Sequence, residues 1–92
     1  NVVMSAVSEY YGVTSEDLKS SRRNREITVP RQVAMYLIRE LNGASLPRIG
    51  LEFGGRDHTT VIHACDKVAE DIQRDASMRS TVEALKKRIQ GA

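Results

Sequence analysis

A pair of adjacent glycines, Gly54-Gly55, separates two segments whose apolar residues follow the period of an α-helix. Ser45 is a residue type that caps helix starts and precedes the first, short segment, and Asp57 can cap the second, longer one. The apolar face of the longer segment consists of Val61, Ala64, Cys65, Val68 and Ile72. A short helix, a glycine-containing turn and a longer helix are the elements of a helix-turn-helix. We therefore predict this motif at about residues 45–75.

Helical periodicity also marks the rest of the chain, and no run alternates with period two. Gly12 is expected to end a first helix, Thr14 to cap a short second one, and Pro30 to begin a longer third one. The apolar stripes of the first, third and last helices are Val3, Ala6, Val7 and Tyr10; Val33, Ala34, Leu37, Ile38 and Leu41, with Met35 and Tyr36 at the margin; and Met78, Val82, Leu85 and Ile89. The predicted fold is all-α, a compact bundle of about six helices in one domain, 1–92.

Charge is unevenly distributed along the chain, although the net charge is only +2. Residues 1–18 contain three acidic and no basic residues, whereas residues 19–31 contain five basic residues and one acidic residue. The segment 20–30 has no helical period and ends on a proline, so we expect a basic loop at about 19–30. Such a loop faces either a polyanion or solvent, and composition leaves both alternatives open.

The bulk composition narrows the setting of the protein. A single cysteine cannot form an internal disulfide, which fits a reducing compartment. No stretch approaches the roughly 18 apolar residues of a membrane span, and no signal peptide is visible. The sequence starts without Met inside an expected helix, so we expect a domain of a longer protein.

The start of the second motif helix carries residues suited to reading bases, and in a helix-turn-helix this end enters the major groove. Asp57 can accept a hydrogen bond from the cytosine amino group, and His58 can donate one to a purine or thymine. The methyl group of Thr59 can lie against a thymine methyl. A neighbouring stripe suits the phosphates of one strand and consists of Arg56, Thr60, His63 and Lys67. These chemistries favour DNA contact over a solvated helix face.

Other basic and polar residues are expected to face the same ligand. Gln32 and Arg39 project away from the buried stripe of their helix. Arg31 and Gln32 are expected in its first turn, where free amide groups favour a phosphate. An arginine of the basic loop, Arg23 or Arg25, is suited to an A·T-rich minor groove, whose negative potential attracts guanidinium groups.

These residues together resemble a known family. The run SLPRIGLEFGGRDHTTVIHAC (Ser45–Cys65), preceded by RRNR and PRQVAMYLIREL, resembles the C-terminal DNA-binding domain of the bacterial DnaA replication initiators, over essentially the whole chain. The resemblance implies binding to double-stranded boxes of the TTATNCACA type at the replication origin. It also implies a cytoplasmic, nucleoid-associated initiator whose separate AAA+ module binds ATP. This chain itself is then expected to be no enzyme and to need no cofactor.

The resemblance further implies individual contacts. Base contacts fall on Arg23 in the minor groove, on Asp57, His58 and Thr59 in the major groove, and on Leu46 and Pro47 beside the bases. Phosphate contacts fall on Arg25, Arg31, Gln32, Arg39, Ser45, Arg56, Thr60, His63 and Lys67. The domain alone is expected to be monomeric, and anionic membrane lipid or regulatory proteins are the alternative partners.

A metal site or a catalytic site is not predicted. His58 and His63 are five residues apart, about 140° around a helix, and Cys65 lies on the core face, so they do not converge on a metal. Cys65 is instead expected to be a small buried core residue. The chain has no GxxxxGK[ST] phosphate loop.

Overall fold

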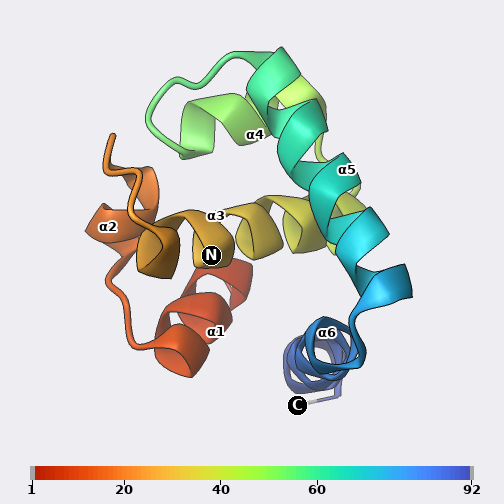
Figure 1. Ribbon diagram of the computed structural model, residues 1–92. Coiled ribbons are helices and arrows are strands. Elements are labelled where there is room, and N and C mark those ends of the chain that lie inside the picture. The colour runs from red at the N-terminus through yellow and green to blue at the C-terminus, as the bar shows by residue number, and fades with distance from the viewer. Residues whose placement is uncertain (1, 92) are drawn as a thin grey trace.

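The computed structural model describes residues 2–91, and every regular element in that range is helical. The elements in order are α1 (Val2–Tyr11), α2 (Ser15–Lys19), α3 (Arg25–Leu37), the π-helical turn η1 (Ile38–Asn42), α4 (Leu46–Glu52), α5 (His58–Arg74) and α6 (Ala76–Gln90). Figure 1 shows α3 crossing the middle of the molecule, with α4 and α5 beyond one side of it and α1 beyond the other. The predicted all-α fold and the helix-turn-helix, α4 and α5, are confirmed.

The core forms around α3, which packs against α1, α2 and α5. Because α3 is covered from several directions, its buried surface is wider than one stripe, and Met35, expected at the margin, is only 1% exposed. Leu41 is only partly buried, at the end of η1. Tyr10, expected in the buried stripe of α1, is 49% exposed, and its hydroxyl lies 3.2 Å from Thr81 Oγ1 of α6. The remaining stripe of α1 is buried as predicted.

The expected basic loop at 19–30 is wrong in extent. Helix α3 begins at Arg25, so Pro30 is its sixth residue rather than its first, and the loop covers only residues 20–24. A proline inside a helix removes one backbone hydrogen bond. Ile27 and Pro30 are both buried, so the packing of this extra turn outweighs that loss.

Side-chain caps fix the starts of α2, α4 and α5 at the residues that the sequence predicts, whereas Asn24 before α3 makes no side-chain cap bond. Ser45 Oγ accepts a hydrogen bond from the backbone N–H of Arg48 at 3.3 Å, and Asp57 Oδ1 accepts one from the backbone N–H of Thr59 at 3.3 Å. Thr14 opens α2 with a reciprocal capping box. Each cap satisfies amide groups that the first turn of a helix leaves without partners.

The turn between α4 and α5 folds back tightly onto α4. Phe53 is fully buried beneath it, and the backbone N–H groups of Gly55 and Arg56 both donate to the carbonyl of Gly50, at 3.0 and 2.8 Å. A Cβ on Gly50 would lie only 2.0 Å from the Arg56 carbonyl oxygen, so no other residue fits there. These contacts fix the position of α4 relative to the start of α5.

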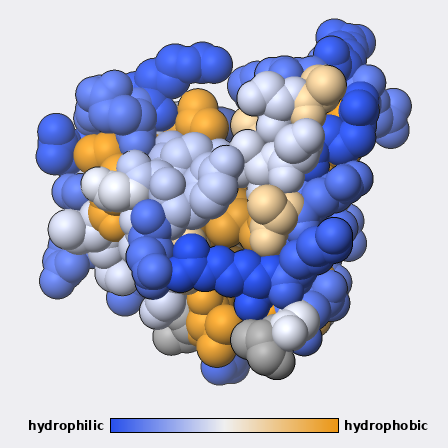
Figure 2. All heavy atoms as spheres, turned by 90° about the horizontal axis from the view of Figure 1, so that it is seen from below, coloured by the Kyte–Doolittle hydropathy of each residue, from blue (hydrophilic) through white to orange (hydrophobic). Residues whose placement is uncertain are grey.

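Helix α6 turns back from the end of α5 and packs on α1. Arg88 of α6 pairs with Glu9 of α1, and Lys86 Nζ lies 5.8 Å from the ring centre of Tyr36 in α3. Figure 2 shows the molecule from below the view of Figure 1: hydrophilic residues cover most of this face, and apolar residues show in hollows between them. Between residues 2 and 91, no helix is both long and apolar enough to cross a membrane.

Candidate nucleic-acid interface

The first turn of α5 is exposed, as the sequence predicts. The side chains of Asp57 and His58 are 68% and 59% exposed, and Asp57 Oδ1 lies 3.1 Å from His58 Nδ1. Thr59 is also exposed, whereas Val61 and Cys65 on the opposite face of the helix are buried. The three predicted base-reading side chains therefore project from a helix whose other face is fixed in the core.

The predicted phosphate stripe lies along a groove between α3 and α5. The side chains that line this groove include Arg31 and Gln32 of α3 together with Arg56, Thr60, His63 and Lys67. Thr60, His63 and Lys67 are exposed, while Arg56 and Gln32 are half-buried. The structure thus brings together side chains that sequence reasoning assigned to one surface from two separate helices.

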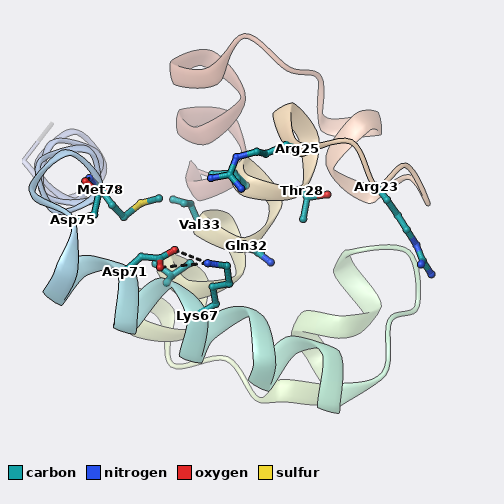
Figure 3. Close-up of a pocket in the computed structure, with 11 residues that line it drawn as sticks. Arg23, Arg25, Thr28, Gln32, Val33, Lys67, Asp71, Asp75 and Met78 are labelled. Carbon is teal, nitrogen blue, oxygen red and sulfur yellow. Dashed lines mark hydrogen bonds and ion pairs between the residues drawn. The ribbon is translucent and has the colours of Figure 1, made fainter.

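The two arginines considered for the minor groove point in different directions. In Figure 3, Arg25 extends over α3, whereas Arg23 extends from the loop toward the side where the turn between α4 and α5 lies. Arg23 lines a groove with Gly54, Arg56 and Thr60, so it lies near the start of α5. Of the two candidates, Arg23 is the one placed beside the predicted base-reading turn.

Lys67 is held by an acidic neighbour one helical turn later. Its Nζ lies 3.1 and 3.3 Å from the two carboxylate oxygens of Asp71, as the dashed lines in Figure 3 mark. An ammonium group has three donors, so this pair still leaves one for another acceptor. The Lys67 side chain is 55% exposed and remains accessible from solvent.

Arg31 does not occupy the place that the sequence suggests. It lies in the second turn of α3 rather than the first, and it is only 6% exposed. Its Nε donates to the carbonyl of Leu18 at 2.8 Å, and its Nη2 donates to the carbonyls of Ser20 at 2.9 Å and Asp17 at 3.2 Å. The guanidinium therefore has partners inside the protein. The prediction that Arg31 and Gln32 lie in the first turn of this helix is wrong for both residues, because α3 begins at Arg25.

Arg56 also has internal partners. Its guanidinium donates to the carbonyl of Phe53 in its own turn and to the carbonyl of Ser20 at the end of α2. Burial lowers the pKa of Arg56, and burial together with the neighbouring Arg56 lowers the pKa of Arg31. Both arginines therefore donate to the carbonyl of Ser20, in the segment that leads to Arg23.

The helix-turn-helix and its exposed turn match a known family. Residues 1–68 match the model of the bacterial DnaA protein helix-turn-helix. The chain belongs to this DnaA family. The chromosomal replication initiator protein DnaA of Symbiobacterium thermophilum is 53% identical over 87 residues, which are 95% of this chain and 19% of that protein.

Solved structures agree with this DnaA assignment. The crystal structure of a DNA replication initiation factor superposes with a TM-score of 0.85 at 39% identity, over 95% of this chain and 26% of that one. The AMPPCP-bound structure of DnaA from Aquifex aeolicus superposes with a TM-score of 0.78 at 36% identity, over 96% of this chain and 26% of that one. The chain therefore spans about a fifth to a quarter of the length of these relatives.

The remaining predicted site residues of this DnaA domain line neither of the two grooves described above. Ser45 and Pro47 are exposed and Leu46 is half-buried, all at the start of α4. Arg39 is exposed on η1 and interacts with Cys65; burial raises the pKa of the Cys65 thiol, and Arg39 partly offsets this. Across the described residues 2–91, no group of three or more His, Cys, Asp or Glu side chains is placed to hold a metal ion.

Sequence reasoning missed how the DnaA domain holds its basic loop. The contacts from Arg31 and Arg56 to carbonyls 11 to 36 residues away have no local signal in the sequence. The early start of α3, in contrast, did have a local signal in the sequence. Ile27 continues the helical spacing back from Ala34, and Asn24 before it is a residue type that begins helices.

Proposed function

We propose that this domain binds double-stranded boxes of the TTATNCACA type at a replication origin, with the first turn of α5 in the major groove and Arg23 in the minor groove. One observation carries the proposal: α5 presents an acceptor, a ring donor and a methyl group in one exposed turn, while its opposite face is buried. Reading bases requires side chains held by a rigid support, and the core supplies it. The relative from Symbiobacterium thermophilum, a chromosomal replication initiator, supports the origin as the target.

In the major groove, each residue of the turn has its own task. Asp57 uses Oδ1 to cap the helix, and its second oxygen accepts from a cytosine amino group. His58 donates to a purine or thymine acceptor, and the Thr59 methyl packs on a thymine methyl. Leu46 and Pro47, at the start of α4, approach the bases from the other motif helix.

Arg23 supplies the second reading element. A narrow A·T-rich minor groove concentrates negative potential, which attracts a guanidinium group inserted into it. Arg23 is exposed and lies close to the start of α5, as the groove that it shares with Gly54 and Thr60 indicates. The two grooves of one box are thus read from one face of the domain.

Phosphates are bound by side chains around these two elements. We assign this role to Arg25, Gln32, Arg39, Ser45, Arg56, Thr60, His63 and Lys67, and we give Arg31 a supporting role because it is buried. Phosphate contacts fix the register of a protein on DNA and make binding depend on salt. One helix-turn-helix and an asymmetric box favour a monomer on DNA.

The rest of the initiator lies outside this chain. Since the chain spans 19% of its Symbiobacterium relative, we propose that ATP binding resides in another module of a cytoplasmic, nucleoid-associated protein. The structure of the Aquifex relative was determined with AMPPCP bound. This domain itself then needs no cofactor.

A fluorescence anisotropy titration tests the proposal. A labelled TTATCCACA duplex and a scrambled duplex are titrated with the domain at two salt concentrations, beside vesicles with and without anionic lipid. The proposal predicts a preference for the box of about 10³-fold or more and a steep loss of affinity with salt. Equal affinity for both duplexes, or binding to anionic vesicles alone, contradicts it.

A further inference from the structure

We propose that Arg31 and Arg56 are positioning residues, which fix the Arg23 loop against the recognition helix before DNA is bound. The inference rests on the proposed function, in which Arg23 reads the minor groove. It gives Arg31 this task in place of a phosphate contact, and it gives Arg56 this task in addition to the phosphate contact proposed above. Three contacts between distant parts of the chain carry it.

The first contact joins α2 to α3. A short helix such as α2 leaves its last carbonyl groups without helical partners. The buried guanidinium of Arg31 occupies these groups, with bonds to the carbonyls of Leu18 and Ser20 at 2.8 and 2.9 Å and a third to Asp17 at 3.2 Å. The end of α2 is therefore tied to the central helix.

The second contact joins the loop to the helix-turn-helix. Arg56 precedes the cap of α5 by one residue, and its guanidinium bridges the carbonyl of Phe53 and the carbonyl of Ser20. Arg31 and Arg56 thus meet at one oxygen, and a carbonyl oxygen has two lone pairs to accept both. Ser20 is only three residues before Arg23, so the clamp acts close to the minor-groove side chain.

The third contact is between backbones. Gly54 has a φ of +82°, and a Cβ on it would lie 2.5 Å from the carbonyl oxygen of Lys19. Gly55 has a similar φ of +79°, but a Cβ there would meet nothing within 4 Å. Both glycines have a positive φ that other residues rarely adopt, but only Gly54 lies against α2. This difference provides a matched pair of variants.

The consequence is a fixed spacing between the two reading elements. The loop at 20–24 is short, its first residue is held by both arginines, and its last leads directly into α3. Arg23 therefore has little freedom to move relative to the first turn of α5. A loop ordered before binding loses less conformational entropy on DNA than a free one, and it favours boxes of one length.

A double-mutant cycle tests the clamp. Gly54→Ala and Gly55→Ala are each made with Arg23 intact and with Arg23→Ala, and all four are titrated with the box duplex. We expect Gly54→Ala to lose about tenfold more affinity than Gly55→Ala when Arg23 is present, and the two to bind alike when Arg23 is absent. The same penalty in both backgrounds overturns the inference.

Base selectivity separates positioning from a loss of stability. Duplexes altered at the A·T-rich end or at the CACA end of the box are compared for each glycine variant. Displacement of the loop should reduce discrimination at the A·T-rich end and leave it unchanged at the CACA end, which α5 reads. A variant that loses discrimination at both ends has been damaged as a whole, and that result contradicts the inference. If Gly54→Ala does not fold, Arg56→Ala replaces it in this selectivity comparison only, because a lost phosphate contact weakens all duplexes alike. Arg48→Ala, which removes an exposed arginine of α4, is the control for lost charge.

A measurement without DNA keeps this inference separate from the proposed function. Amide hydrogen exchange at Ser20 and Arg22, whose N–H groups donate to Asp17 O and to Ser20 Oγ, should accelerate at least about tenfold more in Gly54→Ala and Arg56→Ala than in Gly55→Ala, because the clamp fixes Ser20. Unchanged exchange overturns the clamp. If exchange changes as expected but Arg23→Ala leaves box affinity intact, the clamp is correct and the proposed minor-groove role is wrong.

Discussion

The start of α5 and the loop at 20–24 are both proposed to read DNA, yet the protein builds them in opposite ways. The start of α5 is local: Asp57 caps the helix two residues before the amide it binds, and helical spacing separates its exposed and buried faces. The loop is held from a distance, by side chains of Arg31 and Arg56 that lie 11 and 36 residues along the chain from Ser20.

The two regions therefore differ in which contacts fix the positions of their side chains. A capped helix start keeps its geometry wherever the helix is placed, so its side chains are set by a few neighbouring residues. The loop has short-range bonds between Arg22, Ser20 and Asp17, but its position relative to α5 is fixed only when α2, α3 and the turn before α5 are assembled. Damage to the assembly should therefore affect the loop first, and damage to the cap should affect only α5.

The largest effect is expected at Phe53, which supports the turn before α5 and also binds an arginine that contacts the loop. Phe53 is fully buried beneath the turn, and its carbonyl accepts from Arg56. Phe53→Ala should lower the free energy of unfolding by about 3–5 kcal/mol, because it removes a large core side chain and leaves a cavity. Urea denaturation measures this loss. Leu51→Ala, at a neighbouring site that is 75% exposed, should change the stability by less than about 0.5 kcal/mol.

Arg31→Ala is expected to damage the loop side more than the α5 side. It removes one donor from each of three carbonyl groups at the end of α2, although Ser20 O still accepts from Arg56 and Asp17 O from Ser20. We therefore expect a loss of about 2–3 kcal/mol in unfolding free energy. Thermal unfolding monitored by circular dichroism measures it. Arg25→Ala, which removes an exposed arginine from the same helix, is the control; an equal loss in both variants would show that burial of Arg31 is not the cause.

The sequence predicted the α5 region because its determinants are close together. The cap residue, the glycine break and the apolar spacing all fall between Ser45 and Ile72, and they placed α4, α5 and the exposed turn. The predicted loop is too long because Pro30 is typical of a helix start, whereas α3 begins at Arg25 and buries Ile27. The partners of Arg31 and Arg56 could not be predicted, since they depend on how three helices pack.

Removing the base-reading side chains is expected to reduce DNA discrimination and to leave the stability nearly unchanged. His58→Ala and Thr59→Ala remove exposed groups, so the free energy of unfolding should stay within about 0.5 kcal/mol of the parent. Discrimination between box and scrambled DNA should fall by about 1–3 kcal/mol, while much of the nonspecific affinity remains. Competition titrations measure both affinities. Discrimination equal to that of the parent would place the reading edge elsewhere.

Asp57 caps α5 and is also proposed to read a base, and two substitutions separate these roles. Asp57→Ala removes the cap of α5 and should cost about 1 kcal/mol of stability, whereas Asp57→Asn keeps the cap and should be nearly neutral. Both variants remove the carboxylate proposed to accept from cytosine, so both should bind the box less selectively. Denaturation and duplex titrations of the two side by side give the comparison. A stability loss in Asp57→Asn equal to that in Asp57→Ala would contradict the capping role.

The smallest effect is expected at Lys67, which lines the groove between α3 and α5. Its pair with Asp71 is exposed and one helical turn apart, so Lys67→Ala should change the stability by no more than about 0.5 kcal/mol. If Lys67 neutralises one phosphate, the slope of log affinity against log salt falls by about one unit, equally for box and scrambled DNA. Lys87→Ala, on the exposed face of α6, should leave that slope unchanged. A loss confined to the box would instead make Lys67 a base-reading residue and extend the locally encoded surface of α5 by two further turns.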